Sequence, residues 1–500
     1  MFNGGMISAA IKFERRIILS TIAAIATPDA PGGISVIRIS GEDALKTAGR
    51  VFKSVSGKTP EDMEGYTCAY GHVIENGENI DDAVLTVFRS PKSYTGEDVA
   101  EISCHGGRYI TKKILRIILG SGAALAQPGE FTKRAFLNGK LSLTQAEAVM
   151  DVISSGSETE LRCAGALKEG AVFRRISSLR ERLVSVLGDL AAWADFPEED
   201  IPEVRPEALL KSLRELISDF KKTADTYEYG RIIREGIGTV IVGKPNVGKS
   251  TLMNLLSGFQ RSIVTDIAGT TRDVIEESVR VGELTLRLSD TAGIRETGDV
   301  IESMGVDIAY KRLEEADLVL AVFDSTRPLE KEDIELIERV KNKKSIAIIN
   351  KIDQKKESGE RRNHNNRESE FTLYENKNGS GVKLNKNDAP YIYDNFIHVV
   401  ELSARDGSGL EKLTCTLENM FIDKNTEFNN GIIANERQRD CLQRSINLVN
   451  TAIEALERGE LLDAVTVLLD SACDYLMELT GEKASEKVID DVFSRFCVGK

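Results

Sequence analysis

The sequence predicts a multidomain protein with an α+β N-terminal domain, an α-helical bundle domain and an α/β domain inserted within the helical part. Three observations predict this class. Short β-rich runs mix with helical patterns before residue 125, helical periodicity dominates 131–235 and the region after Asn435, and strands alternate with helices between Gly236 and Phe421. Because helical runs flank the α/β region on both sides, we expect them to pack together around a nested domain.

The composition agrees with several soluble, globular domains. The chain has 500 residues, 41% of them hydrophobic, and 65 basic against 79 acidic side chains give a net charge of −14. This excludes collagen-like, wholly disordered and disulfide-scaffold classes. The seven cysteines form no C-x-x-C pair, which fits a reducing cytoplasm. The acidic balance argues against coating of nucleic acid but permits a local basic patch for RNA, and no signal peptide or membrane span is expected.

The N-terminal region alternates β-rich runs with helical spacing. Proline and glycine interrupt its first turn, from Pro28 to Gly33. Apolar residues Ile110, Ile114 and Ile118 predict a helix over 109–119. Strands are expected at 21–27, 34–40, 83–89 and 99–105.

The spacing of apolar residues also predicts the helices and strands of the helical and α/β regions. Long helices are expected from 143 and over 174–193, with a turn-rich break at 196–202. Residues 354–395 are rich in Asn, Lys, Glu and Gly, which is typical of a flexible surface insertion. Apolar strands of the α/β domain are expected at 239–242, 284–288, 318–323, 345–349 and 398–402.

A phosphate-binding motif follows the first strand of the α/β region. Gly243–Ser250 (GKPNVGKS) matches G-x-x-x-x-G-K-[ST] between an apolar strand and a helical pattern, which makes an ordinary glycine-rich turn improbable. Lys249 would neutralise β- and γ-phosphate charge, and Ser250 would ligate Mg²⁺. The nucleotide-contacting residues expected here are Asn246, Val247, Gly248, Lys249, Ser250 and Thr251.

Two further motifs, each after a strand, indicate a guanine base. The carboxylate of Asp353 can accept from the N1–H and N2–H₂ of guanine together, a donor pair that adenine lacks. Asn350 would bridge to the phosphate-binding loop, Lys351 would cover the base, and Ser403 and Ala404, with Arg405 beside them, would offer a backbone N–H to guanine O6. Each short motif is weak alone, but in this order they predict a Ras-like P-loop GTPase domain.

Two segments between these motifs resemble the switches of such domains. The run Asp290, Thr291, Ala292, Gly293 would hold Mg²⁺ through water and sense the γ-phosphate. Ile294 stands where Ras-like GTPases carry a water-orienting Gln, so another group must take that role. The acidic candidates are Glu296, Asp299 and Glu302. No arginine finger is obvious, although Arg295 and Arg272 lie in the switches, and solvated switch charges are the simpler interpretation for most of these residues. The upstream switch covers Thr265, Asp266, Ile267, Ala268, Gly269, Thr270 and Thr271.

With four further blocks, these motifs resemble the MnmE (TrmE) family of tRNA-modification GTPases from about Thr21 to Lys500. The blocks are Thr21–Gly41, Ser93–Gly107, Pro128–Ala148 and the terminal Phe496-Cys497-Val498-Gly499-Lys500. The extension and the insertion depart from the family pattern. The implied domains are an N-terminal extension (1–19), a tetrahydrofolate-binding and dimerisation domain (20–138), the two helical segments (139–235 and 426–500) and the G domain (236–425).

The resemblance implies two metal ions and a catalytic carboxylate. Mg²⁺ would be held by Ser250 and Thr271. Glu302 matches the carboxylate that orients the attacking water, and Arg295 remains a catalytic candidate in the switch. A K⁺ ion would replace an arginine finger in dimerised G domains, with ligands from Asn246, Thr265, Ile267 and Thr270.

The resemblance also implies a folate site and a reactive C-terminus. Arg38, Glu101, Lys140 and Lys500 match positions that bind 5-formyl- or 5,10-methylene-tetrahydrofolate. Cys497 matches a cysteine associated with the modification step. A small packed residue near the terminus is its simpler interpretation.

We therefore expect a cytoplasmic, homodimeric GTP hydrolase, stimulated by K⁺ and without membrane contact. It would form a heterotetramer or larger complex with a flavin-dependent MnmG (GidA)-type partner and act on tRNA. Together they would place an aminomethyl or carboxymethylaminomethyl group on C5 of the wobble uridine, with folate as one-carbon source. The alternatives are a ribosome-assembly GTPase that binds RNA, and a folate-binding regulatory module whose GTPase is only a switch.

Overall fold

The computed structural model of the protein describes residues 20–195, 206–258, 276–289, 313–354, 371–375, 381–385, 389–423 and 426–500. The chain divides into two compact units. The first contains 1–150, 167–221 and 440–500, and the second contains 151–166 and 222–439. Within the described ranges, no helix is both long and apolar enough to cross a membrane.

The first unit contains a seven-stranded sheet in the order β3-β4-β5-β6-β2-β1-β7. Neighbouring strands are antiparallel, except that β1 and β7 run parallel. The alternating burial of β2 and β5 turns one face of the sheet toward a core that α2 and α3 help to form. The elements are β1 (Ile22–Ile25), β2 (Ile34–Ser40), α2 (Ala44–Val51), β3 (Phe52–Ser54), β4 (Thr67–Glu75), β5 (Glu78–Phe88), β6 (Val99–His105), α3 (Arg108–Gly120) and β7 (Ala124–Leu125), with a 3₁₀ turn at Pro60–Asp62.

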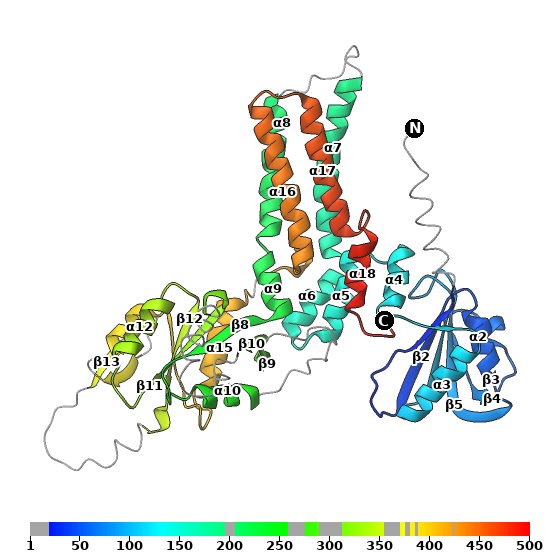
Figure 1. Ribbon diagram of the computed structural model, residues 1–500, viewed down its shortest axis with the longest axis horizontal. Coiled ribbons are helices and arrows are strands. Elements are labelled where there is room, and N and C mark those ends of the chain that lie inside the picture. Colours follow the sequence, from blue (N-terminus) through cyan, green and yellow to red (C-terminus); the bar gives the residue numbers. More distant parts are fainter. Residues whose placement is uncertain are drawn as a thin grey trace, which may run out of the picture. The chain divides into compact units, whose positions relative to one another are not determined.

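Helices from before and after the inserted domain pack against one another in the first unit. Helix α7 lies along α17, Arg214 of α8 pairs with Glu457 of α16, and the hydroxyl of Ser445 on α16 donates to the carbonyl of Ala472 on α17 (Figure 1). This confirms that the helical part is built from two separate stretches of sequence. The helices that lie wholly or mostly in the first unit are α4 (Glu130–Leu137), α5 (Leu143–Ser154), α7 (Ala171–Asp195), α8 (Pro206–Ala224), α16 (Glu436–Glu457), α17 (Leu462–Thr480) and α18 (Glu486–Ser494). Helices α6 (Glu158–Lys168) and α9 (Tyr227–Glu235) belong mostly or wholly to the second unit.

The second unit contains a six-stranded sheet in the order β15-β12-β11-β8-β10-β9. All neighbouring pairs are parallel except β9 with β10. Strands β11 and β12 are almost continuously buried, as expected for a parallel sheet covered on both faces. The elements are β8 (Ile237–Val242), α10 (Lys249–Gly258), β9 (Glu276–Val281), β10 (Leu284–Ser289), β11 (Leu318–Asp324), α12 (Lys331–Val340), β12 (Ser345–Asn350), α14 (Ala389–Asn395), β15 (His398–Glu401) and α15 (Leu410–Phe421), followed by a 3₁₀ turn at Phe428–Asn430.

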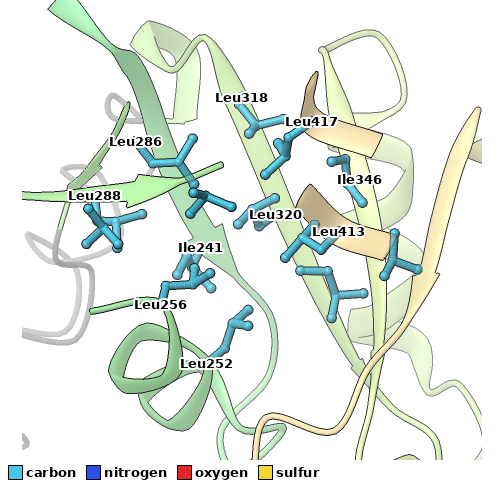
Figure 2. Close-up of a cluster of buried hydrophobic side chains, with 14 of the residues drawn as sticks. Ile241, Leu252, Leu256, Leu286, Leu288, Leu318, Leu320, Ile346, Leu413 and Leu417 are labelled. Atoms are coloured by element: carbon cyan, nitrogen blue, oxygen red, sulfur yellow. The ribbon is translucent and has the colours of Figure 1, made fainter. Parts of the chain in front are cut away.

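A leucine- and isoleucine-rich cluster fixes α10 and α15 against one face of this sheet. Leu252 and Leu256 of α10 are fully buried against Ile241 of β8, and Leu413 and Leu417 of α15 cover the neighbouring strands (Figure 2). Burying one such side chain stabilises a fold by roughly 1.5–3 kcal/mol. The cluster therefore holds the start of α10, which follows the phosphate-binding motif, in a fixed place at the end of β8.

The observed elements confirm the predicted fold class and differ in detail. The sequence does not predict strands β3, β4, β7 and β9. Strands β3 and β7 have only three and two residues, alternate residues at the start of β4 are exposed, and β9 has only two apolar residues. Within the predicted insertion, β13 (Phe371–Glu375) pairs antiparallel with β14 (Gly381–Asn385). The expected break at 196–202 and the N-terminal extension lie outside the described residues.

Candidate functional site

The phosphate-binding motif forms a tight loop between β8 and α10. Asn246 and Gly248 adopt left-handed backbone conformations, with φ of 63° and 101°. A Cβ atom on Gly248 would lie 2.2 Å from the side-chain nitrogen of Asn350, so only glycine permits this approach. Ser250 and Thr251 are exposed at the first turn of α10. The loop therefore presents backbone N–H groups and a hydroxyl at a helix N-terminus, which suits phosphate and Mg²⁺.

Lys249 is held inside this loop by backbone carbonyls. Its ammonium donates to the carbonyl oxygens of Gly243 and Lys244, each at 2.8 Å. Burial lowers the pKa of Lys249 from its ordinary value. A phosphate anion would offset the cost of that burial, since it favours the charged ammonium. The geometry fits the predicted role of Lys249 as the cation that meets the phosphates.

Asn350 connects the three nucleotide-binding loops. The side chain is 2% exposed, and its nitrogen donates to the carbonyl of Val247 at 2.8 Å. Its oxygen accepts from the backbone N–H of Ala404 at 2.9 Å. The predicted bridge from Asn350 to the phosphate-binding loop is therefore present. Because the Ala404 N–H already has an acceptor, guanine O6 would have to share or replace that bond.

The residues expected to recognise the base gather beside Asn350. Lys351 has a φ of 66°, and its ammonium donates to the carboxylate of Asp324 at 2.6 Å. Asp353 follows in the same loop, and Ser403, fully buried, holds a turn in which the Gly407 N–H donates to its carbonyl at 2.9 Å. Arg405 is exposed next to this turn. Sequence reasoning missed Asp324, whose position at the end of β11, beside β12, was the available signal.

The switch candidates cannot be placed in the same way. Outside the described residues lie Thr265, Asp266, Ile267, Ala268, Gly269, Thr270, Thr271, Asp290, Thr291, Ala292, Gly293, Arg295 and Glu302. Their roles in Mg²⁺, K⁺ and water positioning stay predictions. Among the predicted K⁺ ligands, Asn246 lies within the described part of the chain.

A second cluster forms in the first unit, where the C-terminal tail packs on the sheet domain. The Phe131 N–H donates to the carbonyl of Lys500 at 3.2 Å, and the Gly129 N–H donates to the carbonyl of Cys497 at 3.4 Å. Phe496 and Phe493 are buried before the tail, with ring centroids 5.3 Å apart. The last residues are therefore anchored on α4 and on the turn before it. The Cys497 side chain remains exposed.

The predicted folate residues partly converge on this tail. The Nε of Arg38 donates to Glu101 at 2.7 Å across the β2–β6 pair, and its guanidinium lies over Tyr94 and Phe131, 5.4 and 5.6 Å from their ring centroids. Burial lowers the pKa of Lys500, and the nearby Arg38 charge lowers it further while Glu101 opposes this.

Lys140 is placed differently, since its ammonium donates to the carbonyl of Pro91 at 3.1 Å. Sequence reasoning missed the flanking aromatic rings of Tyr94 and Phe131, although both lie in the blocks that carry the family resemblance. The two rings and the Arg38–Glu101 pair give this cluster flat apolar faces beside paired charges.

Comparisons with known proteins cover the whole described architecture. The model of the MnmE helical domain matches residues 143–497, and the model of the GTP-binding protein TrmE N-terminus matches residues 21–140. A tRNA modification GTPase MnmE of Clostridioides difficile (strain 630) is 42% identical over 481 residues, which covers 96% of this chain and 99% of that protein. The protein of the same name from Thermoanaerobacter pseudethanolicus is 39% identical, over 97% of this chain and 100% of that one.

A solved structure resembles part of the chain. The structure of Era in complex with MgGDPNP and nucleotides 1506–1542 of 16S ribosomal RNA is 27% identical, covers 42% of this chain and 66% of that chain, and has a TM-score of 0.26.

Proposed function

The chain belongs to the MnmE family of tRNA modification GTPases, and from this premise we propose how its GTP hydrolysis serves the modification. We propose that it acts as a homodimer in the cytoplasm with a flavin-dependent MnmG-type partner, in a heterotetramer or larger complex that binds tRNA. Together they add an aminomethyl or carboxymethylaminomethyl group to C5 of the wobble uridine, with 5-formyl- or 5,10-methylene-tetrahydrofolate as the one-carbon source.

One observation carries the modification part of this proposal. The C-terminal tail is anchored on the sheet domain, so Lys500 lies within electrostatic reach of the Arg38–Glu101 pair while the Cys497 thiol stays exposed. A folate ring can stack on Tyr94 or Phe131, its amino and ring N–H groups can donate to Glu101, and cations can hold its glutamate tail. In this proposal, the exposed Cys497 thiol is the candidate nucleophile that meets the one-carbon donor.

The GTPase part rests on the loops of the second unit. Lys249 meets the phosphates, Ser250 offers a hydroxyl to Mg²⁺, and Asp353 accepts from guanine. The attacking water would be oriented by Glu302, with Arg295 as a further candidate in the same switch. A K⁺ ion bound by Asn246 and by Thr265, Ile267 and Thr270 would supply the positive charge that stabilises the transition state. G-domain dimerisation completes that site, so turnover should rise with protein concentration.

The first experiment measures GTP turnover in K⁺ and in Na⁺ at matched ionic strength and at several protein concentrations. We expect faster turnover in K⁺, and an Asn246→Ala variant that loses the stimulation while it still binds GDP. Equal rates in both salts would leave a GTP hydrolase and remove the K⁺ mechanism.

The second experiment separates modification from a purely regulatory folate module. A Cys497→Ser variant should lose tRNA modification in the presence of the MnmG-type partner and keep its GTP turnover. Normal modification by this variant would show that Cys497 has no chemical role. The ribosome-assembly alternative gains no support, because the relatives named above match almost the whole chain and are tRNA modification GTPases.

A further inference from the structure

Residues 324–333, which run from the last residue of β11 through the β11–α12 connection to the first turn of α12, contact both nucleotide-binding loops. At its start, the Asp324 carboxylate accepts from Lys351 of the guanine loop at 2.6 Å. The backbone N–H and hydroxyl of Thr326 donate to the same carboxylate at 2.9 and 2.7 Å. The Asp324 side chain is 7% exposed, so its position is fixed by these donors. This end of the connection therefore holds Lys351, and with it the left-handed backbone that leads to Asp353.

At the other end, three carboxylates surround Lys244, the second residue of the phosphate-binding loop. Its ammonium pairs with Glu330, with Glu332 at 2.6 Å and with Asp333 at 3.5 Å. The Lys244 side chain is 12% exposed although Glu330 and Glu332 are open to solvent. Glu330 and Asp333 also form the capping box of α12, in which the Glu330 N–H donates to Asp333 at 3.0 Å. The acidic cap of α12 thus depends on a cation from another loop.

The same residue links this cap to the phosphate-binding lysine. The Lys244 carbonyl accepts from the Lys249 ammonium at 2.8 Å, so displacement of the Lys244 side chain would move a backbone group that orients Lys249. Lys244 also neutralises carboxylates that would otherwise repel the phosphates of GTP. Both effects act on nucleotide binding through position and charge, without contact between Lys244 and the reacting atoms.

We propose that the β11–α12 connection is a positioning segment for GTP, whose terminal carboxylates hold Lys244 of the phosphate-binding loop and Lys351 of the guanine loop at a fixed spacing. Lys244, Glu332 and Asp324 are then positioning residues. The proposal concerns GTP binding alone and does not depend on folate, K⁺ or the partner protein. No short motif identifies these residues, because the segment lies between the known motifs in sequence.

The main test compares Lys244→Met with Lys244→Arg in the full-length protein. The measurements are the dissociation rate of a fluorescent GDP analogue by stopped flow and the KM and kcat for GTP. Lys244→Met should release GDP about tenfold faster and raise KM similarly, since the three partly exposed ion pairs of Lys244 are lost together. The kcat should change by less than about threefold, because no group at the reacting phosphate is removed.

A matched control removes a lysine–glutamate pair elsewhere on α12. Lys341 pairs with Glu338 at the C-terminal end of this helix, so Lys341→Met should release GDP at the wild-type rate. Lys244→Arg should recover GDP release to within about twofold of wild type, since the guanidinium can meet the same carboxylates. Thermal melting of each variant reports whether the fold is intact. Glu332→Gln, at an exposed site, repeats the test with little risk to folding.

Two results would overturn the proposal. Wild-type GDP release by folded Lys244→Met and Glu332→Gln would show that the pairs do not position the loop. A Lys244→Arg variant as impaired as Lys244→Met would show that charge pairing is not the cause.

The double variant Lys244→Met/Asp324→Asn tests the shared segment itself. If one connection sets the spacing of both loops, the second substitution should add clearly less than its separate effect. If the two separate effects multiply to within about twofold, the two ends act independently, and the proposal of one positioning segment is wrong.

Discussion

The nucleotide-binding loops and the C-terminal tail cluster solve the same problem, the placement of charged groups, in different ways. In the second unit, contiguous motifs at strand ends build the site, and Asn350 ties them together through two backbone groups. In the first unit, Arg38 and Glu101 come together only through the β2–β6 register, and Lys500 arrives from the far end of the sequence. The nucleotide site is built from local motifs and backbone groups, whereas the C-terminal tail cluster depends on tertiary topology.

This difference predicts that the two sites fail differently. A change in a loop residue of the second unit should impair GTP binding or hydrolysis, because the groups expected to contact the nucleotide lie in these loops. A change in the tail should impair folate binding and modification while GTP turnover continues.

Lys249→Ala should have the largest effect. The variant loses the ammonium that is expected to meet the β- and γ-phosphates, and loss of one such stabilising group typically lowers kcat on the order of 100- to 1,000-fold. Phosphate release under saturating GTP measures this directly. The tail cluster should be untouched, so folate binding should match that of the wild type. Turnover within threefold of wild type would contradict the assignment of the phosphate-binding loop.

Asp353→Asn should change base selection more than turnover. The carboxylate is expected to accept from two N–H groups of guanine, and the Asn amide oxygen can still accept from one of them. Loss of one charged hydrogen bond costs about 1.5–3 kcal/mol, so GDP affinity should fall about 10- to 100-fold. The Asn amide can donate to the carbonyl at C2 of xanthine, so affinity for XDP should rise. Competition between GDP and XDP for the site gives both numbers. Unchanged GDP affinity would remove Asp353 from the base site.

How much the sequence could predict follows from the same contrast. The phosphate and guanine motifs could be found because a phosphate cradle needs glycine, lysine and a hydroxyl at fixed spacing. The parallel strands could be found from their long apolar runs. The positions of Arg38, Glu101 and Lys500 came from family resemblance, since nothing local distinguishes Arg38 from a surface charge on a strand.

For other contacts, the sequence does not indicate which residues are partners. Lys244 forms a salt bridge with Glu332, and Asp324 forms one with Lys351. The two partners in each pair are 27 or more positions apart in the chain, so tertiary structure defines the pairing. Strand β4 was missed because alternate residues, among them Tyr70, are exposed on an antiparallel strand of mixed composition. In each case the missing information was the position of a neighbour, which periodicity does not contain.

Gly499→Ala should affect the tail cluster alone. Gly499 has a φ of 96°, and a Cβ atom there would lie 2.2 Å from the carbonyl oxygen of Ile25. The tail must therefore shift, and we expect weaker binding of 5-formyltetrahydrofolate by about tenfold and faster removal of the terminus by carboxypeptidase, given a strain of roughly 1–3 kcal/mol. GTP turnover should stay within twofold.

A second glycine serves as its control. Gly459 also has a positive φ, of 72°, but its Cβ would meet nothing within 4 Å, so Gly459→Ala isolates backbone strain from the clash. Equal effects of the two variants on the tail would show that the contact with Ile25 is unimportant.

The smallest effect concerns the charge of Lys500 and tests whether burial or pairing governs it. Burial lowers the pKa of this lysine, and the charge of Arg38 adds to the lowering. A lowered folded-state pKa means that the protonated side chain destabilises the folded state, and that this cost disappears as pH rises from the folded pKa toward the unfolded value of about 10.4. Lys500→Met should therefore raise the melting temperature slightly at pH 7, by about 2 °C or less, with the difference shrinking toward pH 10.

Lys46→Met, at an exposed lysine, should show no such trend. A difference of opposite sign would mean that attraction to Glu101 outweighs both burial and the repulsion from Arg38, and the tail cluster would then resemble the nucleotide loops in its charge pairing.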